Sequence, residues 1–280
     1  MQFASQFLCF ARQLGVTLGN ILGIAIAHQP GHGEGKDLVF LAVGHDGREV
    51  VGGVSFAVEP GQVVAVVGPS GCGKSTLMRA LAGLDPAMAG DSWILGERLG
   101  GLDEAGRDAL LRRVGFMFQG SALWSSLTLA ENVELPLREF ARCGARERRL
   151  LALHKLGQVG LLGAADKLPA EISGGMAKRA GLARALALDP DVLFLDEPSA
   201  GLDPVTSARL DDLILRLRDG LGTSIVLVSH EVPSIRRLAD FCVYLDPESR
   251  TMAATGKIDD FLRPGAHPGA RAFFSRHAQP

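Results

Sequence analysis

The sequence lacks an excess of positive charge. Its 29 lysine and arginine residues stand against 31 aspartate and glutamate residues, and the formal net charge is −2. A protein that holds nucleic acid mainly through the phosphate backbone needs a net positive field. We therefore expect no nucleic acid among its main partners.

Closely spaced cysteines are also missing. The chain has four cysteines, Cys9, Cys72, Cys143 and Cys242, and they lie far apart in the sequence. Zinc ribbons and thiol redox motifs need close cysteine pairs, so the spacing indicates neither kind of site. Nothing in the cysteine pattern requires an oxidising compartment.

The sequence also has little in the way of long hydrophobic runs. Residues 14–27 form an uncharged apolar stretch of fourteen residues. A helix of that length reaches only about 21 Å, and the hydrocarbon core of a bilayer measures about 30 Å. We expect that this stretch does not span a membrane.

The first 36 residues leave three interpretations open. Arg12 before the apolar stretch and the small residues at 25–27 resemble a secretory signal, although export would separate the nucleotide site described below from its ATP. The spacing of apolar residues over 3–21 predicts an amphipathic helix on lipid or on a partner. A poorly ordered leader or a misassigned start codon is the third possibility. The glycine-rich residues 28–36 read as a linker, so we place the globular body from residue 37 onward.

The body reads as an α/β fold with one inserted helical region. Short aliphatic runs alternate with helical stretches such as 204–218, which predicts a mostly parallel sheet covered on both faces. Between residues 128 and 188 the pattern changes to helices alone, which indicates a helical subdomain. The expected strands are residues 50–58, 62–67, 114–118, 192–195, 224–228 and 241–245.

A glycine-rich loop follows the second of these strands and opens a helix over residues 75–81. Its backbone N–H groups and the helix dipole suit a bound phosphate, so the loop predicts an ATP site. Lys74 supplies a charge for the β- and γ-phosphates, and the Ser75 hydroxyl is a ligand for Mg²⁺. The predicted ATP-binding residues of the loop are Gly68, Pro69, Ser70, Gly71, Cys72, Gly73, Lys74, Ser75 and Thr76.

Cys72 lies in this loop at the start of a helix. A helix N-terminus lowers the pKa of a thiol, which predicts a cysteine that is sensitive to alkylation. The alternative is a small residue tolerated at a variable position of the loop.

Two carboxylates end the strand at 192–195. Asp196 is expected to hold Mg²⁺, and Glu197 is expected to orient or deprotonate the attacking water. Gln119 and His230 also follow strands and can sense the γ-phosphate, with Gln119 a further Mg²⁺ ligand. Glu197 and His230 are the predicted catalytic residues.

A serine-glycine segment, Ser173-Gly174-Gly175-Met176, opens a helix before the carboxylate strand, and Ser199-Ala200-Gly201-Leu202-Asp203 follows that strand. In this order, the motifs resemble the nucleotide-binding domain of ABC proteins over residues 37–262. The resemblance implies a P-loop NTPase fold with a RecA-like mixed sheet, additional antiparallel strands and a helical subdomain at about 123–188. Residues 1–36 and 263–280 would then form a leader and a tail.

The resemblance also implies a head-to-tail homodimer. In that arrangement Ser173, Gly174, Gly175 and Met176 of one copy would cap the γ-phosphate bound at Lys74 of the other, and Asp203 would lie in the dimer loop. A serine hydroxyl and glycine N–H groups at a helix N-terminus form a second anion cradle, which agrees with this role.

A narrower resemblance is to the Mce-associated, Mla-type lipid-trafficking ATPases. It rests on residues 118–124, on residues 131–139, and on Met176, which stands where most ABC proteins have glutamine. That likeness implies a membrane permease, a Mce-domain lipid-binding protein, and a peripheral position on the cytoplasmic face of the inner membrane. Residues 121–138 would contact the permease. An amino-acid importer, a lipoprotein exporter, a soluble ABC protein acting on DNA or ribosomes, and a subunit that binds ATP without hydrolysis are the alternatives.

Two further expectations concern aromatic residues. ABC domains usually stack adenine on an aromatic residue before the phosphate loop, and His45 is the candidate that this sequence offers. In the tail, Phe261, Phe273 and Phe274 are expected to dock on the body or on the second copy.

Overall fold

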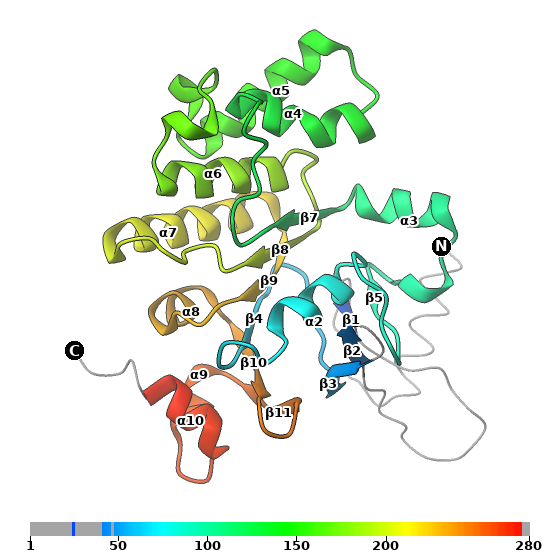
Figure 1. Ribbon diagram of the computed structural model, residues 1–280, viewed down its shortest axis with the longest axis vertical. Helices are drawn as coiled ribbons and strands as arrows, with labels where there is room; N and C mark the ends of the chain where they lie inside the picture. Colours follow the sequence, from blue (N-terminus) through cyan, green and yellow to red (C-terminus); the bar gives the residue numbers. More distant parts are fainter. Residues whose placement is uncertain (1–23, 26–40, 46–47, 276–280) are drawn as a thin grey trace.

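The computed structural model describes residues 24–25, 41–45 and 48–275 of the chain (Figure 1). The largest sheet in the described part has eight strands in the order β2-β3-β11-β10-β4-β9-β8-β7. Neighbours from β10 to β7 pair in parallel, as the alternating pattern predicted. The strands are β2 (Leu41–His45), β3 (Arg48–Val54), β4 (Val63–Val67), β7 (Val114–Met117), β8 (Val192–Asp196), β9 (Ser224–Val228), β10 (Phe241–Asp246) and β11 (Thr251–Gly256).

Strands β4, β8 and β9 form the centre of the sheet, and every residue in them is buried. Continuous aliphatic sequence is expected where a parallel strand is covered on both faces. Helices α7 (Pro204–Leu221) and α8 (Val232–Leu238) cover one face, and α2 (Lys74–Leu81) covers the other (Figure 1).

The edge of the sheet is antiparallel, in the pairs β2–β3 and β10–β11. The strand expected at 50–58 is displaced, because β3 begins at Arg48 and ends at Val54. Phe56 and Val58 are both buried beyond its end. Apolar residues therefore continue to alternate up to residue 58, because they are buried, although the chain no longer pairs with β2.

Residues 84–113 carry no predicted helix or strand. They contain β5 (Trp93–Ile94), β6 (Glu97–Arg98), the 3₁₀ turn η1 (Leu99–Gly101) and α3 (Glu104–Leu111). Strand β1 (Ile24–Ala25) pairs with β5. The secretory signal, the amphipathic helix and the linker proposed for the first 36 residues otherwise lie outside the described residues.

A layer of helices is inserted between β7 and β8, where the sequence predicted helices alone. It consists of α4 (Leu129–Phe140), α5 (Ala145–Gln158) and α6 (Gly174–Ala185), with the turns η2 (Leu162–Ala164) and η3 (Pro169–Glu171). Thr128 and Glu131 form a capping box that fixes the start of α4. Figure 1 shows this layer stacked above α7 at one end of the sheet.

The tail continues as α9 (Ile258–Leu262) and α10 (Pro268–Ser275). Phe261 and Phe274 are buried and stack with their ring centroids 5.1 Å apart. Phe273 packs partly buried against the same core and lies 6.3 Å from the Tyr244 ring on β10. The prediction that these aromatics dock is confirmed, and they dock on the body of their own chain.

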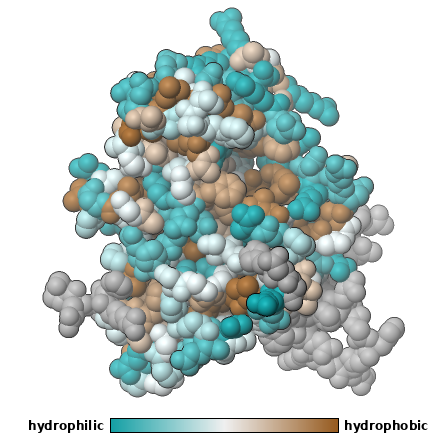
Figure 2. Space-filling view, in the orientation of Figure 1, coloured by the Kyte–Doolittle hydropathy of each residue, from teal (hydrophilic) through white to brown (hydrophobic). Residues whose placement is uncertain are grey.

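Hydrophilic residues cover most of the face shown in Figure 2, while hydrophobic surface gathers between the helical layer and α3. Among the described residues, no helix combines the length and the apolar character needed to cross a bilayer.

Candidate functional site

The residues predicted from separate motifs meet at one edge of the parallel sheet. The phosphate loop follows β4, Gln119 follows β7, and His230 follows β9, while Asp196 and Glu197 lie at the end of β8. The carboxyl ends of neighbouring parallel strands share one edge, and ligands commonly bind there. Ten residues line a pocket of about 470 Å³ at this edge: Val50, Ser70, Gly71, Gly73, Lys74, Ser75, Thr76, Gln119, Glu197 and His230.

Gly73 makes the turn from the loop into α2. Its φ of +93° lies in the left-handed region, and a Cβ atom there would lie 2.2 Å from Cγ2 of Val51. Only glycine fits both constraints. No side chain caps the N-terminus of α2, so its first N–H groups remain available to an anion.

The Lys74 side chain is only 7% exposed and is held by its own loop. Its Nζ donates to the carbonyl oxygens of Gly68 at 2.9 Å and Pro69 at 2.8 Å. These bonds keep the ammonium beside the turn that precedes α2. A phosphate in the loop would therefore meet a positive charge already in place.

The lowered thiol pKa predicted for Cys72 is wrong. The side chain is buried, and burial raises the pKa of the thiol despite the opposing charge of Lys74. The desolvation cost of a thiolate exceeds the effect of the helix N-terminus here. The alternative, a small residue tolerated in the loop, agrees with the structure.

Ser75 and Asp196 form the pair expected for a divalent cation. The Ser75 hydroxyl donates to Oδ1 of Asp196 at 3.1 Å. Burial raises the pKa of the Asp196 carboxyl, and the bond from Ser75 opposes that shift. The described residues hold no cluster of three acidic, histidine or cysteine ligands. Mg²⁺ bound to phosphates and water needs only one or two protein oxygens, so the Ser75–Asp196 pair fits this ion.

Glu197 has an unusual backbone and one carboxylate oxygen without a partner. Its side chain is buried, and its φ of +49° is a strained value for a non-glycine residue. Oε1 lies 2.7 Å from Nδ1 of His230, whereas Oε2 is buried with no hydrogen-bond partner. This geometry leaves Oε2 able to accept a proton or a hydrogen bond from a group in the pocket.

Lys178 is a residue of this site that the sequence analysis missed. Its Nζ donates to the carbonyl oxygen of Gln119 and, at 2.9 Å, to that of Glu197. The side chain is 7% exposed, and burial lowers the pKa of its ammonium. The sequence does contain a signal for Lys178. This lysine shares one face of α6 with Leu182 and Ala185, which are both buried, and a charged residue on an apolar helix face calls for a buried partner.

The tip of α6 is not part of this pocket. Ser173 and Gly174 are exposed, and the Ser173 hydroxyl caps the helix by accepting from the N–H of Met176 at 3.3 Å. Ser173 and Gly175 line a separate pocket of about 540 Å³ that also contains Arg179. One copy of the chain therefore does not bring this tip to Lys74.

Asp203 has a local structural role. It caps α7, accepting from the N–H groups of Val205 and Thr206 at 3.1 and 3.0 Å. Hydrogen bonds from Thr206 hold the pKa of this carboxyl below its usual range. Its expected place in a dimer loop stays a prediction.

His45 ends β2 opposite Arg48, and its side chain lies outside the described atoms. Its contact with adenine stays a prediction as well.

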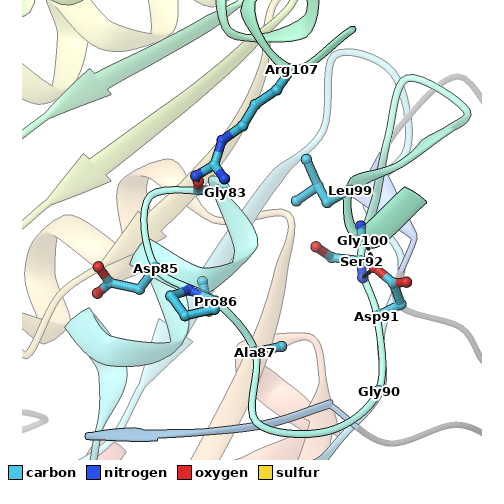
Figure 3. Close-up of a pocket in the computed structure, with 11 residues that line it drawn as sticks. Gly83, Asp85, Pro86, Ala87, Gly90, Asp91, Ser92, Leu99, Gly100 and Arg107 are labelled. Carbon is cyan, nitrogen blue, oxygen red and sulfur yellow. Dashed lines mark hydrogen bonds between the residues drawn. The ribbon is translucent and has the colours of Figure 1, made fainter. Parts of the chain in front are cut away.

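A smaller pocket of about 230 Å³ lies between the end of α2 and the β5–β6 hairpin (Figure 3). Arg107 donates to the carbonyl oxygen of Gly83, and Asp91 accepts from the N–H groups of Ser92 and Gly100. Its charged groups are therefore bound to the surrounding chain, and we assign it no ligand.

Comparison with known proteins gives consistent matches. The sequence profile of the family described as "ABC transporter" matches residues 51–200. The chain is 41% identical over 234 residues to the methionine import ATP-binding protein MetN of Caulobacter vibrioides, covering 83% of this chain and 69% of that protein. It is 39% identical over 193 residues to the intermembrane phospholipid transport system ATP-binding protein MlaF of Escherichia coli K12, covering 69% and 72%.

Two solved structures share the architecture. One is the dimeric post-hydrolysis state of the ATP-binding cassette MJ0796 bound to ADP and Pi, with a TM-score of 0.70, 29% identity, and coverage of 86% of this chain and 99% of that chain. The other is cbiO1 of Clostridium perfringens, from an ABC transporter complex, with a TM-score of 0.72 over 85% and 89%. At 22% identity the second likeness concerns the fold alone.

Proposed function

Because the chain belongs to the ABC transporter family and is the ATPase subunit of such a transporter, we propose that Lys74, Glu197 and His230 act together in ATP hydrolysis. Its fold is the mixed α/β P-loop fold of ABC nucleotide-binding domains. The observation that carries the proposal is the contact of Glu197 with His230 at 2.7 Å, in the pocket that Lys74 also lines.

The phosphate loop binds the triphosphate in this mechanism. The uncapped N–H groups at the start of α2 would point to the β-phosphate, and Lys74, held by the loop carbonyls, would lie beside the β- and γ-phosphates. Ser75 and Asp196 would hold Mg²⁺, with Gln119 at the pocket wall, and that ion neutralises charge on the phosphate oxygens.

Glu197 activates the attacking water. Oε2 accepts the hydrogen bond or proton from water, while Oε1 remains bound to His230. The His230 side chain is 48% exposed, which lets it reach the γ-phosphate side of the pocket as well as Glu197. The bond between the two residues keeps the carboxylate in one orientation during the reaction.

Replacing Glu197 by glutamine tests this mechanism. We expect Glu197→Gln to lower the ATPase rate by about 10²- to 10⁴-fold while ATP still binds. The amide keeps the size of the side chain but cannot take a proton from water. Malachite-green phosphate release measures turnover, and Glu147→Gln on the exposed surface of α5 is the control. A rate near wild type for Glu197→Gln contradicts the assignment.

The functional unit is a homodimer in this proposal. ABC ATPases dimerise and pair with permeases. In support, Ser173 and Gly174 are exposed, and the α6 tip lies outside the pocket of its own chain. The tip residues Ser173, Gly174, Gly175 and Met176 would then meet the γ-phosphate at the second copy's Lys74. Asp203 would lie beside that contact, and His45 would stack on adenine.

For the transported substrate we propose phospholipid, moved by a permease with a Mce-domain partner at the inner membrane. The support is Met176 with the segments 118–124 and 131–139, and the 39% identity to MlaF. Trp124 is 62% exposed in the surface expected to contact the permease, residues 121–138. The chain would lie on the cytoplasmic face as a peripheral subunit.

Amino-acid import is the second candidate, because the identity to MetN is 41% over a larger share of the chain. Co-purification with the permease, followed by mass spectrometry of bound lipid, separates the two. More phospholipid bound to this permease than to a matched membrane-protein control supports phospholipid transport. A permease that carries no lipid and binds an amino acid supports the second.

A further inference from the structure

Three residues on one face of α6 contact the segment that begins at Gln119. Lys178, Gly181 and Arg184 are spaced by three residues and therefore lie along one side of the helix. Arg184 donates from Nη1 to the carbonyl oxygen of Ala122 at 2.6 Å and from Nη2 to that of Ser121 at 2.8 Å. With the bond from Lys178 to Gln119, two cations bind three carbonyl oxygens of residues 119–122.

Gly181 allows this close approach. A Cβ atom there would lie 3.1 Å from Cβ of Ser121 and 3.3 Å from its Cα and carbonyl oxygen. These distances are tighter than ordinary van der Waals contact, so a side chain at 181 would require Ser121 to shift by a few tenths of an ångström. The absence of a side chain at 181 therefore lets Ser121 approach α6 closely between Lys178 and Arg184.

The chain held by these contacts is strained. Ser121, Ala122 and Glu197 have φ values of +61°, +47° and +49°. Such conformations persist where surrounding contacts fix them. For Glu197 those contacts are the bond from its own N–H to the carbonyl oxygen of Val228 and the bond from Lys178 to its carbonyl oxygen, each 2.9 Å long.

Packing alone does not explain the two charges. Within the described part of the chain, no carboxylate lies within salt-bridge distance of Lys178 or Arg184. A buried cation without an anionic partner is costly, whereas an apolar residue would fill the same space without that cost. Asp196, Glu197 and Glu231 attract the Lys178 ammonium from beyond that distance. The hydrogen bonds of Lys178 and Arg184, however, go to backbone carbonyl oxygens.

Lys178 also lies close to the tip of its helix. It is four residues beyond Gly174, which corresponds to about 6 Å along the axis, or roughly one turn. A helix is stiff over one turn, so a displacement of the tip also displaces the lysine. The tip is the part of α6 that a second copy's nucleotide would touch.

We propose that Lys178 is a positioning residue that links the α6 tip to Gln119 and Glu197, so that nucleotide binding by the second copy sets the geometry of hydrolysis in the first. Gly181 and Arg184 keep α6 and residues 119–122 together while the tip moves. This inference rests on the proposed function, because it needs the homodimer and the role of Glu197.

The test compares two buried lysines in the full-length protein. Lys178→Met removes the charge at nearly constant size, and Lys178→Arg keeps a cation that can donate to both carbonyls. Lys155→Met is the matched control, since Lys155 is 3% exposed on α5 and pairs with Asp189 away from the site. ATPase rates over a range of ATP, nucleotide affinity and melting temperature are measured for each variant.

We expect Lys178→Met to lower kcat by about 10- to 100-fold, because small displacements of catalytic groups have effects of this size. ATP affinity should stay within about threefold, because Lys178 bonds to none of the phosphate-loop residues 68–76 and, at Gln119, only to the backbone carbonyl oxygen. We expect the dependence of rate on ATP to be cooperative in the wild type and hyperbolic in Lys178→Met. Lys178→Arg should recover most of the rate, and Lys155→Met should lower only the melting temperature.

An unchanged kcat and unchanged cooperativity in Lys178→Met would overturn the proposal. So would equal losses in Lys155→Met and Lys178→Met, which would indicate general destabilisation. If Lys178→Met does not fold, Lys178→Gln takes its place, because its amide can reach only one carbonyl and should give an intermediate loss. A wild-type protein without turnover would instead refute the proposed function, and the same experiment reports it separately.

Discussion

The tips of helices α2 and α6 look alike in sequence but differ in structure. Each begins with glycine or serine, a composition that suits anion binding. The α2 tip is enclosed in a pocket with Lys74, Ser75 and Glu197, and no side chain caps it. The α6 tip is exposed and is capped by its own serine hydroxyl. The α2 tip therefore has charged and polar neighbours from its own chain, whereas among the described residues the α6 tip has only the cap from its own serine.

Of the changes that test this difference between the two tips, removal of the Lys74 side chain should have the largest effect on ATP turnover. We expect Lys74→Ala to reduce ATP turnover by roughly 10²- to 10³-fold or more, because the loop loses the one cation beside the phosphates. Isothermal titration with ATP and Mg²⁺ should show weakened binding to a single copy. Tight binding by Lys74→Ala would mean that the α2 tip alone suffices.

Removing the Ser173 hydroxyl should have a smaller and different effect. We expect Ser173→Ala to leave ATP binding by one copy unchanged, while turnover falls about tenfold through loss of one charge-assisted hydrogen bond. Light scattering of the Glu197→Gln protein with ATP should show dimers that the added Ser173→Ala change weakens. If Ser173→Ala instead reduced binding by the isolated copy, the two tips would belong to one site.

The smallest effect on turnover is expected at Asp211, which lies on α7 and lines neither of the two pockets. It is 2% exposed, and burial raises its pKa from 3.8 to about 6. Between those two pH values the folded state keeps a proton that the unfolded state has lost, so stability falls as pH rises from about 4 to about 6. Asp211→Asn should therefore stabilise the protein by roughly 1–3 kcal/mol above pH 6 and have no effect near pH 4.

Thermal unfolding at the two pH values measures this difference, and the ATPase rate at neutral pH should not change. If Asp211→Asn lowered the ATPase rate, α7 would take part in hydrolysis in addition to the two helix tips.

Much of the site could be predicted because it follows local rules. Asp196, Gln119 and His230 each come at the end of an aliphatic run, and the ends of parallel strands share one edge. Local sequence identifies such positions without knowledge of distant contacts.

Other features depend on residues far away in the sequence. The reactivity expected of Cys72 disappears because the folded chain buries the thiol, and the role of Lys178 depends on which carbonyls lie opposite α6. The short strands in residues 84–113 are too brief to give a periodic signal. The α6 tip itself is identified by its motif, but its exposure is visible only in the structure.

The position of β4 in the sheet has a consequence for how the protein is made. Strand β4 leads into the phosphate loop, yet its two neighbours are β9 and β10, which follow it only after the helical layer has been made. Pairings between such distant segments form slowly, and unpaired strand edges invite aggregation. We therefore expect β4 to stay unpaired until β9 and β10 have been synthesised, so that the nucleotide loop reaches its final shape only after them.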